Sequence, residues 1–193
     1  YYSRGERGAL TPQGWGALQI NRVSLYLHRR HGRDFGPRPG GVTSDAVALV
    51  RKANALGIPV VAWVVIPYDQ GYWAYQGNAQ VNFTAVRDWA AWKRRNRLRF
   101  VSVALDQEFS WQNLQTYMPL AKSRDAQKLD AWMAGNIDPA AQCSALRTYR
   151  DLISWVHRRG IRADAAVAPM VADDLADGDI ALQNAQQTSS TMR

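Results

Sequence analysis

The segment 58–67 constrains the fold more than any other part of the chain, because it is apolar throughout and rich in valine. A strand with one exposed face alternates apolar and polar side chains, so a strand without that alternation must be covered on both faces. This pattern is typical of a parallel sheet flanked by helices, in which each pair of strands needs a crossover connection. The segment therefore predicts an α/β fold.

The rest of the chain supplies the other elements of such a fold. Strands are expected at 21–28, 59–66, 100–107 and 163–170, helices at 45–56, 82–96, 112–134 and 139–158, and a loop at 32–41. Asn82 or Thr84 is the expected N-cap of the second helix, and Pro119 is expected to break the third. The four strands should then be parallel and adjacent in chain order.

Two parallel architectures fit this order, an open doubly wound sheet and a (β/α) barrel of the TIM type. No glycine fingerprint follows the first or the second strand, which disfavours a dinucleotide-binding sheet. A complete barrel typically needs about 250 residues, whereas this chain has 193. We therefore predict one (β/α) TIM-barrel-like domain with parallel strands over residues 1–193, as a partial barrel or the N-terminal portion of a longer one.

Two carboxylates follow the apolar part of the strand at 100–107. Asp106 and Glu108 have the same parity, so in an extended chain their side chains share a face and their Cα atoms lie roughly 6–7 Å apart. Two acids at the carboxyl end of a buried strand suit glycoside hydrolysis, in which one acid protonates the leaving oxygen. We predict that Glu108 is this acid and that Asp106 raises its pKa. The alternative is that both are solvated loop residues.

Other side chains are expected at the same edge of the sheet. Tyr72 and Trp73 lie in an aromatic loop after the second strand, where they can stack on a sugar ring or simply cap the sheet. Tyr26 and Asp69 lie near the ends of the first two strands and can hydrogen-bond the acids or the sugar. Asp173 follows the fourth strand and is the next candidate acid.

The charge balance points to the opposite side of the sheet. The chain has a formal net charge of +8, but no nucleic-acid-binding motif accompanies it. Arginines near the helix ends are expected on a basic back face, where they complement helix dipoles or dock on an anionic membrane or polymer. His28 and His31 lack a third metal ligand, and the single Cys143 excludes an internal disulfide. We expect no metal, no cofactor and no nucleic-acid partner.

Three motifs carry a resemblance to a known family. Gly-Ile-Pro-Val-Val-Ala-Trp at 57–63, Gly-Tyr-Trp-Ala at 71–74 and Val-Ala-Leu-Asp-Gln-Glu at 103–108 resemble motifs of chitinase-like TIM-barrel glycosidases. They are also similar to barrel proteins of actinobacteria in which a strand ending in Leu-Asp-x-Glu follows a Gly-Tyr-Trp loop. The chitinase-like strand motif is Asp-x-x-Asp-x-Glu, and its last Glu is the general acid. The resemblance implies that role for Glu108, with Asp106 before it and Val103 in place of the first Asp.

Two functions from different classes follow from these patterns. The first is a glycoside hydrolase that acts on a polysaccharide or glycan by carboxylate general acid catalysis. The second is a non-catalytic barrel that binds carbohydrate or the cell envelope, and fold alone cannot decide between them. A secreted or cell-envelope location is expected with either, although the chain contains no signal-peptide pattern and no transmembrane segment.

Overall fold

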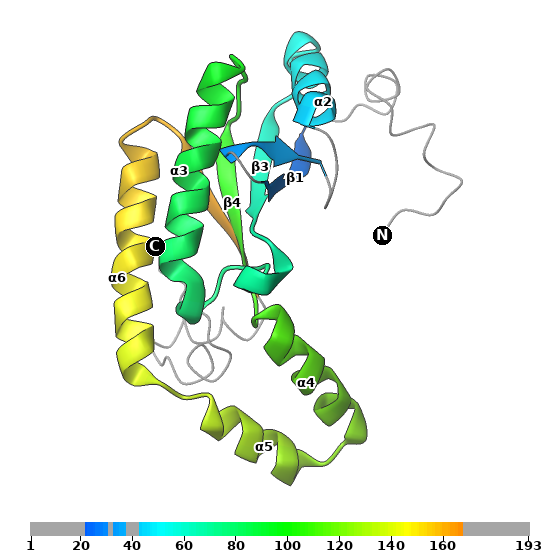
Figure 1. Cartoon of the computed structure of the whole chain (residues 1–193), viewed down its shortest axis with the longest axis vertical. Coiled ribbons are helices and arrows are strands. Elements are labelled where there is room, and N and C mark those ends of the chain that lie inside the picture. Colours follow the sequence, from blue (N-terminus) through cyan, green and yellow to red (C-terminus); the bar gives the residue numbers. More distant parts are fainter. Residues whose placement is uncertain (1–21, 31–32, 38–42, 168–193) are drawn as a thin grey trace, which may run out of the picture.

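The computed structural model describes residues 22–30, 33–37 and 43–167. The strands are β1 (Val23–Arg29), β2 (Phe35–Gly36), β3 (Val60–Val65), β4 (Ser102–Gln107) and β5 (Arg162–Val167). The α-helices are α2 (Thr43–Ala55), α3 (Ala79–Arg95), α4 (Trp111–Ser123), α5 (Ala126–Gly135) and α6 (Pro139–His157) (Figure 1). Two short 3-10 turns, η3 (Tyr68–Gln70) and η4 (Gln76–Asn78), lie between β3 and α3.

The five strands form one open sheet in the order β2-β1-β3-β4-β5. β1, β3, β4 and β5 are parallel and adjacent in chain order, so the predicted α/β fold and strand order are confirmed. The sequence does not predict β2, which lies in the expected loop and pairs antiparallel with the end of β1. A strand of two residues is too short to show any periodicity, so no pattern in the sequence could have revealed it.

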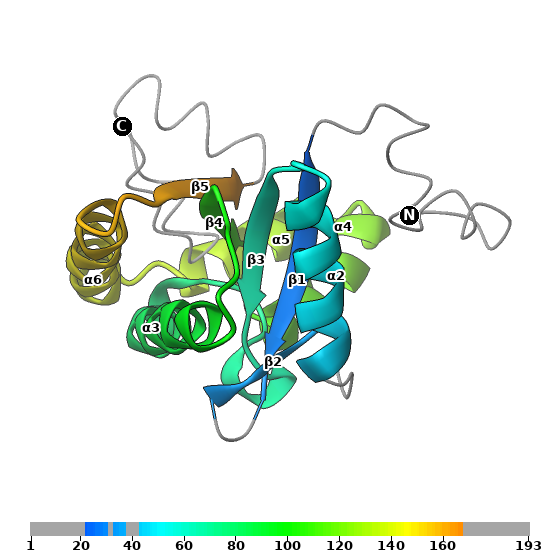
Figure 2. The same ribbon diagram turned by 90° about the horizontal axis from the view of Figure 1, so that it is seen from above.

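One face of the sheet is covered by α2, α3 and α6 (Figure 2). The three helices and the strands share one buried core, to which the strands contribute Leu27, Val64 and Leu105 among others. From α3, the side chains of Trp89 and Trp92 are completely buried. Burying one large apolar side chain typically stabilises a fold by about 2–3 kcal/mol, so the packing of these helices makes a large contribution to holding the strands together.

The opposite face of the sheet carries a different set of side chains. Residues that are partners in a parallel register share a face, and one such row crosses the sheet as Tyr26, Trp63, Ala104 and Asp164. Asp106 lies two residues after Ala104 in β4 and therefore faces the same way. Asp106, the predicted partner of the proton donor Glu108, thus lies on the face that α2, α3 and α6 do not cover.

The start of α3 differs from the prediction. The helix begins at Ala79, directly after η4, so Asn82 and Thr84 lie inside it and do not cap it. Asn82 is buried, and its side-chain amide donates to the backbone oxygen and to Oδ1 of Asn78, at 3.2 and 2.7 Å. This tertiary role explains why a residue with good capping chemistry lies within a helix.

The expected break at Pro119 is also misplaced. Pro119 lies inside α4, and the chain breaks at Arg124, which adopts a left-handed conformation with φ of 58°. Asp125 then caps α5, because its side chain accepts a hydrogen bond of 3.1 Å from the backbone N–H of Lys128. The N-cap hydrogen bond therefore marks the boundary between the two helices better than the proline does.

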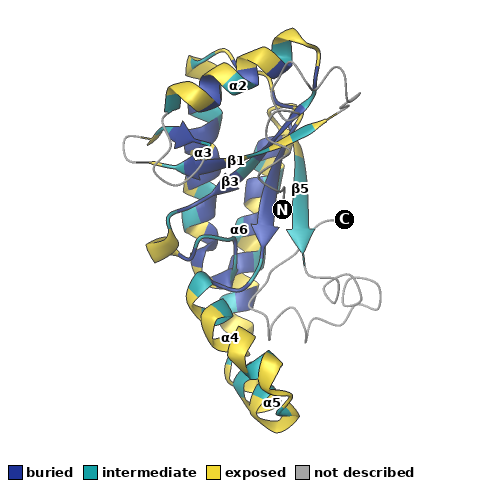
Figure 3. Cartoon of the chain, turned by 90° about the vertical axis from the view of Figure 1, so that its right-hand side faces the viewer, coloured by how far each residue is buried: buried dark blue, intermediate teal, exposed yellow. Residues whose placement is uncertain are grey.

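α4 and α5 project from the carboxyl edge of the sheet, and neither helix contains a buried residue (Figures 1 and 3). The rings of Phe109, Tyr117 and Trp132 pack together within this region, with centroids 4.9–6.0 Å apart. α4 and α5 thus form a helical hairpin that begins at the edge of the sheet where the acids lie and extends away from the core.

No helix in the part of the chain that the structure describes is long and apolar enough to cross a bilayer.

Candidate active site at the carboxyl edge of the sheet

β4 brings Asp106 and Glu108, called here the acid pair, to the carboxyl edge of the sheet. Every residue of β4 is buried, and Asp106 is only 8% exposed. Glu108 follows the last residue of the strand and is half-buried. The two acids are therefore not freely solvated loop residues, which was the alternative that the sequence left open.

The aromatic loop, residues 68–75, is tied to the strand that carries the acid pair. The backbone N–H of Ala74 donates to the carbonyl of Asp106 at 2.8 Å, and the N–H of Glu108 donates to the carbonyl of Ala74 at 3.2 Å. These two bonds form a single parallel bridge beyond the end of β3. On its other side, the loop carbonyl of Gly71 accepts a hydrogen bond of 3.1 Å from the N–H of Trp111, in the first turn of α4. The loop is therefore fixed between β4 and α4.

Asn78 holds the same loop from within. Its side-chain amide donates to the carbonyls of Gln70 and Trp73 at 3.0 and 2.8 Å, and its Oδ1 accepts from the N–H of Tyr75 at 2.9 Å. Gly71 has a φ of 103°, and a Cβ placed there would lie 2.6 Å from the Tyr75 ring and 2.8 Å from Nδ2 of Asn78. The turn therefore requires glycine at this position, and Asn78 provides a hydrogen-bond partner for three backbone groups of the loop.

Tyr72 adopts a left-handed conformation with φ of 64° directly after this glycine. Such a conformation is unusual for a residue with a bulky side chain, and strained residues of this kind concentrate at functional sites. Two backbone hydrogen bonds hold it: its N–H donates to Pro67 at 3.3 Å, and its carbonyl accepts from Ile66 at 3.2 Å. The surrounding backbone therefore enforces the position of this ring.

The carboxyl of Asp106 lies in an environment that favours its neutral form. Burial raises its pKa from 3.8 to about 7, and the nearby charge of Glu108 acts in the same direction. Hydrogen bonds from the side chains of Tyr26 and Trp73 lower this pKa, and the Tyr26 hydroxyl donates to Oδ2 over a long 3.5 Å. Burial also raises the pKa of Glu108. The acid pair is therefore poised to hold a proton close to neutral pH.

Tyr26 remains a hydrogen-bond donor under the same conditions. Burial, together with the charges of Asp106 and Glu108 and the hydrogen bond to Asp106, raises the pKa of Tyr26 to about 12. The phenol is therefore protonated throughout the physiological range, and it can donate to Asp106 when that carboxyl is ionised. Tyr26 is the predicted residue that the structure places in direct contact with Asp106 from another strand.

A continuous chain of ring contacts, called here the aromatic cluster, lies beside the acid pair. Neighbouring rings have centroids 4.3–6.5 Å apart and belong to Trp63, Tyr26, His28, Tyr72, Tyr68, Trp73 and Trp111. Two pairs are nearly parallel: Tyr26 and Trp63 at 10°, and Tyr68 and Tyr72 at 6°. Tyr26 and Tyr68 are 38% and 43% exposed, so the cluster offers accessible aromatic surface at this edge.

A hollow of about 200 Å³ adjoins the aromatic cluster and is lined in part by His28, Tyr68 and Tyr72. It is smaller than the pockets of about 300–1,000 Å³ that usually enclose a ligand. Burial lowers the pKa of His28 to about 4, so its imidazole is neutral at physiological pH. Among the described residues, no group of three or more His, Cys, Asp or Glu side chains is placed to hold a metal ion.

The structure brings some of the predicted residues together and leaves others apart. Tyr26 and Trp73 hydrogen-bond Asp106, and Tyr72 belongs to the aromatic cluster. Asp69 is exposed on η3 and makes no hydrogen bond or ion pair with the acid pair. Asp173 and His31 lie outside the described residues.

Sequence reasoning did not single out Trp63, Tyr68 and Trp111 as site residues. Trp63 looks like a core residue in an apolar strand, yet it stacks on Tyr26 on the face opposite the helices. Its Nε1 is buried and finds no acceptor in the part of the chain that the structure describes. The available signal was the density of aromatic residues on both sides of the acid pair, with Tyr68 before it and Trp111 after it.

Comparisons with protein-family models, with curated proteins and with solved structures found no match for this chain. Function must therefore be inferred from the chemistry of the site itself.

Proposed function

We propose that this protein is a glycoside hydrolase-like enzyme whose acid pair cleaves a glycosidic bond in a polysaccharide or glycan. The observation that carries this proposal is the Asp106 carboxyl, which is buried beside aromatic side chains, has a pKa of about 7 and lies two residues from a second acid. Glycosidases use two carboxyl groups whose surroundings let one stay protonated while the other is ionised.

The two acids have distinct roles in this proposal. The sequence predicts Glu108 as the proton donor, but the deeper burial of Asp106 favours the reverse assignment. Asp106 gives its proton to the glycosidic oxygen as the bond between that oxygen and the sugar carbon breaks. Glu108, as the carboxylate, stabilises the positive charge that develops on the sugar ring or orients the attacking water. The side chains of Tyr26 and Trp73 hold the Asp106 carboxyl in place.

The aromatic cluster supports a sugar as the substrate. Aromatic rings present large, rigid apolar faces, and Tyr in addition carries a hydroxyl that can hydrogen-bond. A sugar ring has the matching combination of an apolar face and polar edges. Four rings of the cluster form a row in the order Tyr26, His28, Tyr72 and Tyr68. The two rings at the ends of this row, Tyr26 and Tyr68, are exposed.

We further propose that the sheet is part of a (β/α) barrel. Doubly wound sheets reverse their strand order at a switch point and carry helices on both faces. Here β1, β3, β4 and β5 follow the order of the chain, and α2, α3 and α6 share a single core on one face. Barrels likewise carry their helices on one face and their catalytic groups at the carboxyl ends of the strands, where the acid pair lies.

A second candidate function is carbohydrate binding without hydrolysis. The small hollow beside the aromatic cluster favours it, because a shallow platform of rings can hold a glycan without enclosing it. Both candidates place the sugar at the same edge, so binding alone does not distinguish them and hydrolysis must be measured.

The test is a screen of polysaccharides and oligosaccharides for release of reducing ends, followed by two substitutions. Asp106→Asn and Glu108→Gln keep the shape of each side chain and remove the acid, so each should lower the rate at least about 100-fold while glycan binding is retained. Asp130→Asn, in an exposed part of α5, is the matched control and should leave the rate unchanged.

The outcomes separate the two functions. Binding without hydrolysis in the wild-type protein would leave carbohydrate binding as the function. Hydrolysis that survives both Asp106→Asn and Glu108→Gln would show that the acid comes from elsewhere, and Asp173 would then be the next residue to replace.

A further inference from the structure

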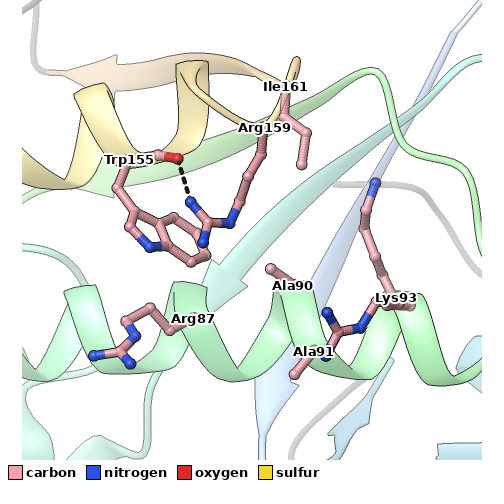
Figure 4. A pocket seen from close by; sticks show the side chains of 8 residues that line it. Arg87, Ala90, Ala91, Lys93, Trp155, Arg159 and Ile161 are labelled. Carbon is pink, nitrogen blue, oxygen red and sulfur yellow. Dashed lines mark hydrogen bonds between the residues drawn. The ribbon is translucent and has the colours of Figure 1, made fainter.

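A groove lies between α3 and α6, on the helical layer of the molecule (Figure 4). It has a volume of about 450 Å³, and Ala90 and Ala91 of α3 lie between the larger side chains that surround it. The cationic side chains that line it are Arg87, Lys93, Arg94 and Arg159. Among the residues that the structure describes, no acidic side chain lines it, so its described lining carries only positive charge. We call it the cationic groove.

The charges of the cationic groove have few partners within the protein. Arg87, Lys93 and Arg94 form no ion pair with any described residue. The acid next to Arg87 in the sequence is Asp88, and it is already paired with Arg29, whose Nη2 lies 2.6 Å from its Oδ2. An anion that entered the groove would therefore not compete with a described carboxylate for Arg87, Lys93 or Arg94.

Helix dipoles explain only part of this arrangement. Lys93 and Arg94 lie in the last turn of α3, where cations complement the negative end of the dipole. Arg87 lies in the middle of α3, beyond the reach of that effect, which falls off within the last turn. Lys93 is also partly buried, which lowers its pKa and disfavours its charged form. A bound anion would offset this cost.

The groove has features that select among anionic ligands. The guanidinium of Arg159 lies 3.6 Å from the centre of the Trp155 ring, so it covers the face on which a nucleic-acid base could stack. The cations lie at both ends of the drawn stretch of α3, with Arg87 at one end and Lys93 at the other (Figure 4). A ligand with several separated negative charges would fit better than a single small ion. Arginine is also well matched to phosphate, which it can contact with two parallel hydrogen bonds.

We propose that the cationic groove binds a flexible polyanion that carries a row of phosphate groups, with Arg87 and Arg94 contacting different phosphates. This site is separate from the acid pair. Lys93 and Arg94 lie in the last turn of α3, whereas Asp106 lies near the carboxyl end of β4, at the opposite end of the sheet (Figure 1). The binding is therefore independent of the proposed hydrolysis.

The experiment measures binding of linear inorganic polyphosphate to the full chain by titration calorimetry at several salt concentrations. The diagnostic variant is Arg87→Gln/Arg94→Gln, because both side chains are exposed and without ion pairs in the described structure, so the fold should be kept. The matched control is Arg150→Gln/Lys122→Gln, which removes the same charge from exposed positions outside the groove. Orthophosphate, vesicles containing phosphatidylserine and a single-stranded oligonucleotide are titrated in parallel.

The proposal expects polyphosphate to bind more tightly than orthophosphate. The diagnostic variant should weaken binding at least about tenfold and make its salt dependence less steep, whereas the control should change it less than about threefold. Equal losses in both variants would overturn the proposal, since the binding would then reflect net charge alone. Tighter binding to vesicles or to the oligonucleotide, lost in the diagnostic variant, would also overturn it by identifying a membrane or nucleic acid as the ligand. Absence of polyphosphate binding would do the same.

Discussion

Replacing Asp106 by Asn should make the stability of the protein less dependent on pH. Asp106 has a folded-state pKa of about 7, above its ordinary value of 3.8, because the carboxyl is buried. Between these values the folded protein holds a proton that the unfolded chain has lost, so this group stabilises the fold at low pH and loses that contribution as the pH rises through 7. The full rise in the pKa of Asp106 corresponds to a loss of about 4 kcal/mol in the free energy of unfolding. About 2.5 kcal/mol of this loss occurs between pH 5 and pH 8.

Asparagine has nearly the same shape and cannot ionise, so the Asp106→Asn variant does not lose this part of its free energy of unfolding as the pH rises. The free energy of unfolding should be measured by urea denaturation at pH 5 and pH 8 for the wild type and the variant. Relative to the wild type, the variant should gain about 2.5 kcal/mol on going from pH 5 to pH 8. Asp130→Asn, on the exposed surface of α5, should show no such gain. A difference between wild type and Asp106→Asn that is the same at both pH values would refute the reasoning, because the carboxyl would then not be held in its neutral form.

Further predictions follow from the contacts of the site. Glu108→Gln should lower the pKa of Asp106, as followed by carboxyl NMR titration, because it removes a neighbouring negative charge. Trp73→Phe should raise the same pKa, since it removes an N–H donor to the carboxylate; a fall would contradict the assigned hydrogen bond. Asn78→Ala should lower the free energy of unfolding by about 3 kcal/mol, because it removes the side-chain partner of three partly buried backbone groups. Thr84→Ala, which removes only an exposed bond within α3, should cost less than about 0.5 kcal/mol in the same denaturation series.

The sequence predicts the parallel strands from short runs of apolar residues, although their burial in the structure differs: every residue of β4 is buried and none of β5 is. The central strand β3 is apolar throughout, β4 contains an apolar run at 103–105, and α3 between them has a regular apolar face. The errors fall where tertiary contacts override local preference. Asn82 could cap a helix by its chemistry, but its hydrogen bonds to Asn78 place it inside α3. Pro119 stays within α4, and the capping bond of Asp125 sets the helix end.

The candidate site was predictable to the extent that it lies on one strand. Asp106 and Glu108 are close in sequence, so strand parity was enough to place them together. The contact of Tyr26 with Asp106 spans 80 residues and depends on the register of three strands. The stack of Tyr26 on Trp63 depends on the pairing of β1 with β3, which no local pattern reveals.

The two faces of the sheet explain how the protein can carry an acid with such a high pKa. In β4 the side chains alternate, so Val103 and Leu105 enter the core shared with α2, α3 and α6, whereas Asp106 faces the opposite side. Above neutral pH the buried carboxylate destabilises the fold by about 4 kcal/mol, which is a large part of the 5–15 kcal/mol that typically separates folded from unfolded domains. The apolar burial of the other face, including the fully buried Trp89 and Trp92, must offset this cost. A cavity in the core, such as that made by Leu105→Ala, should therefore be tolerated better at pH 5 than at pH 8, because at pH 5 only about 1.5 of these 4 kcal/mol has been lost.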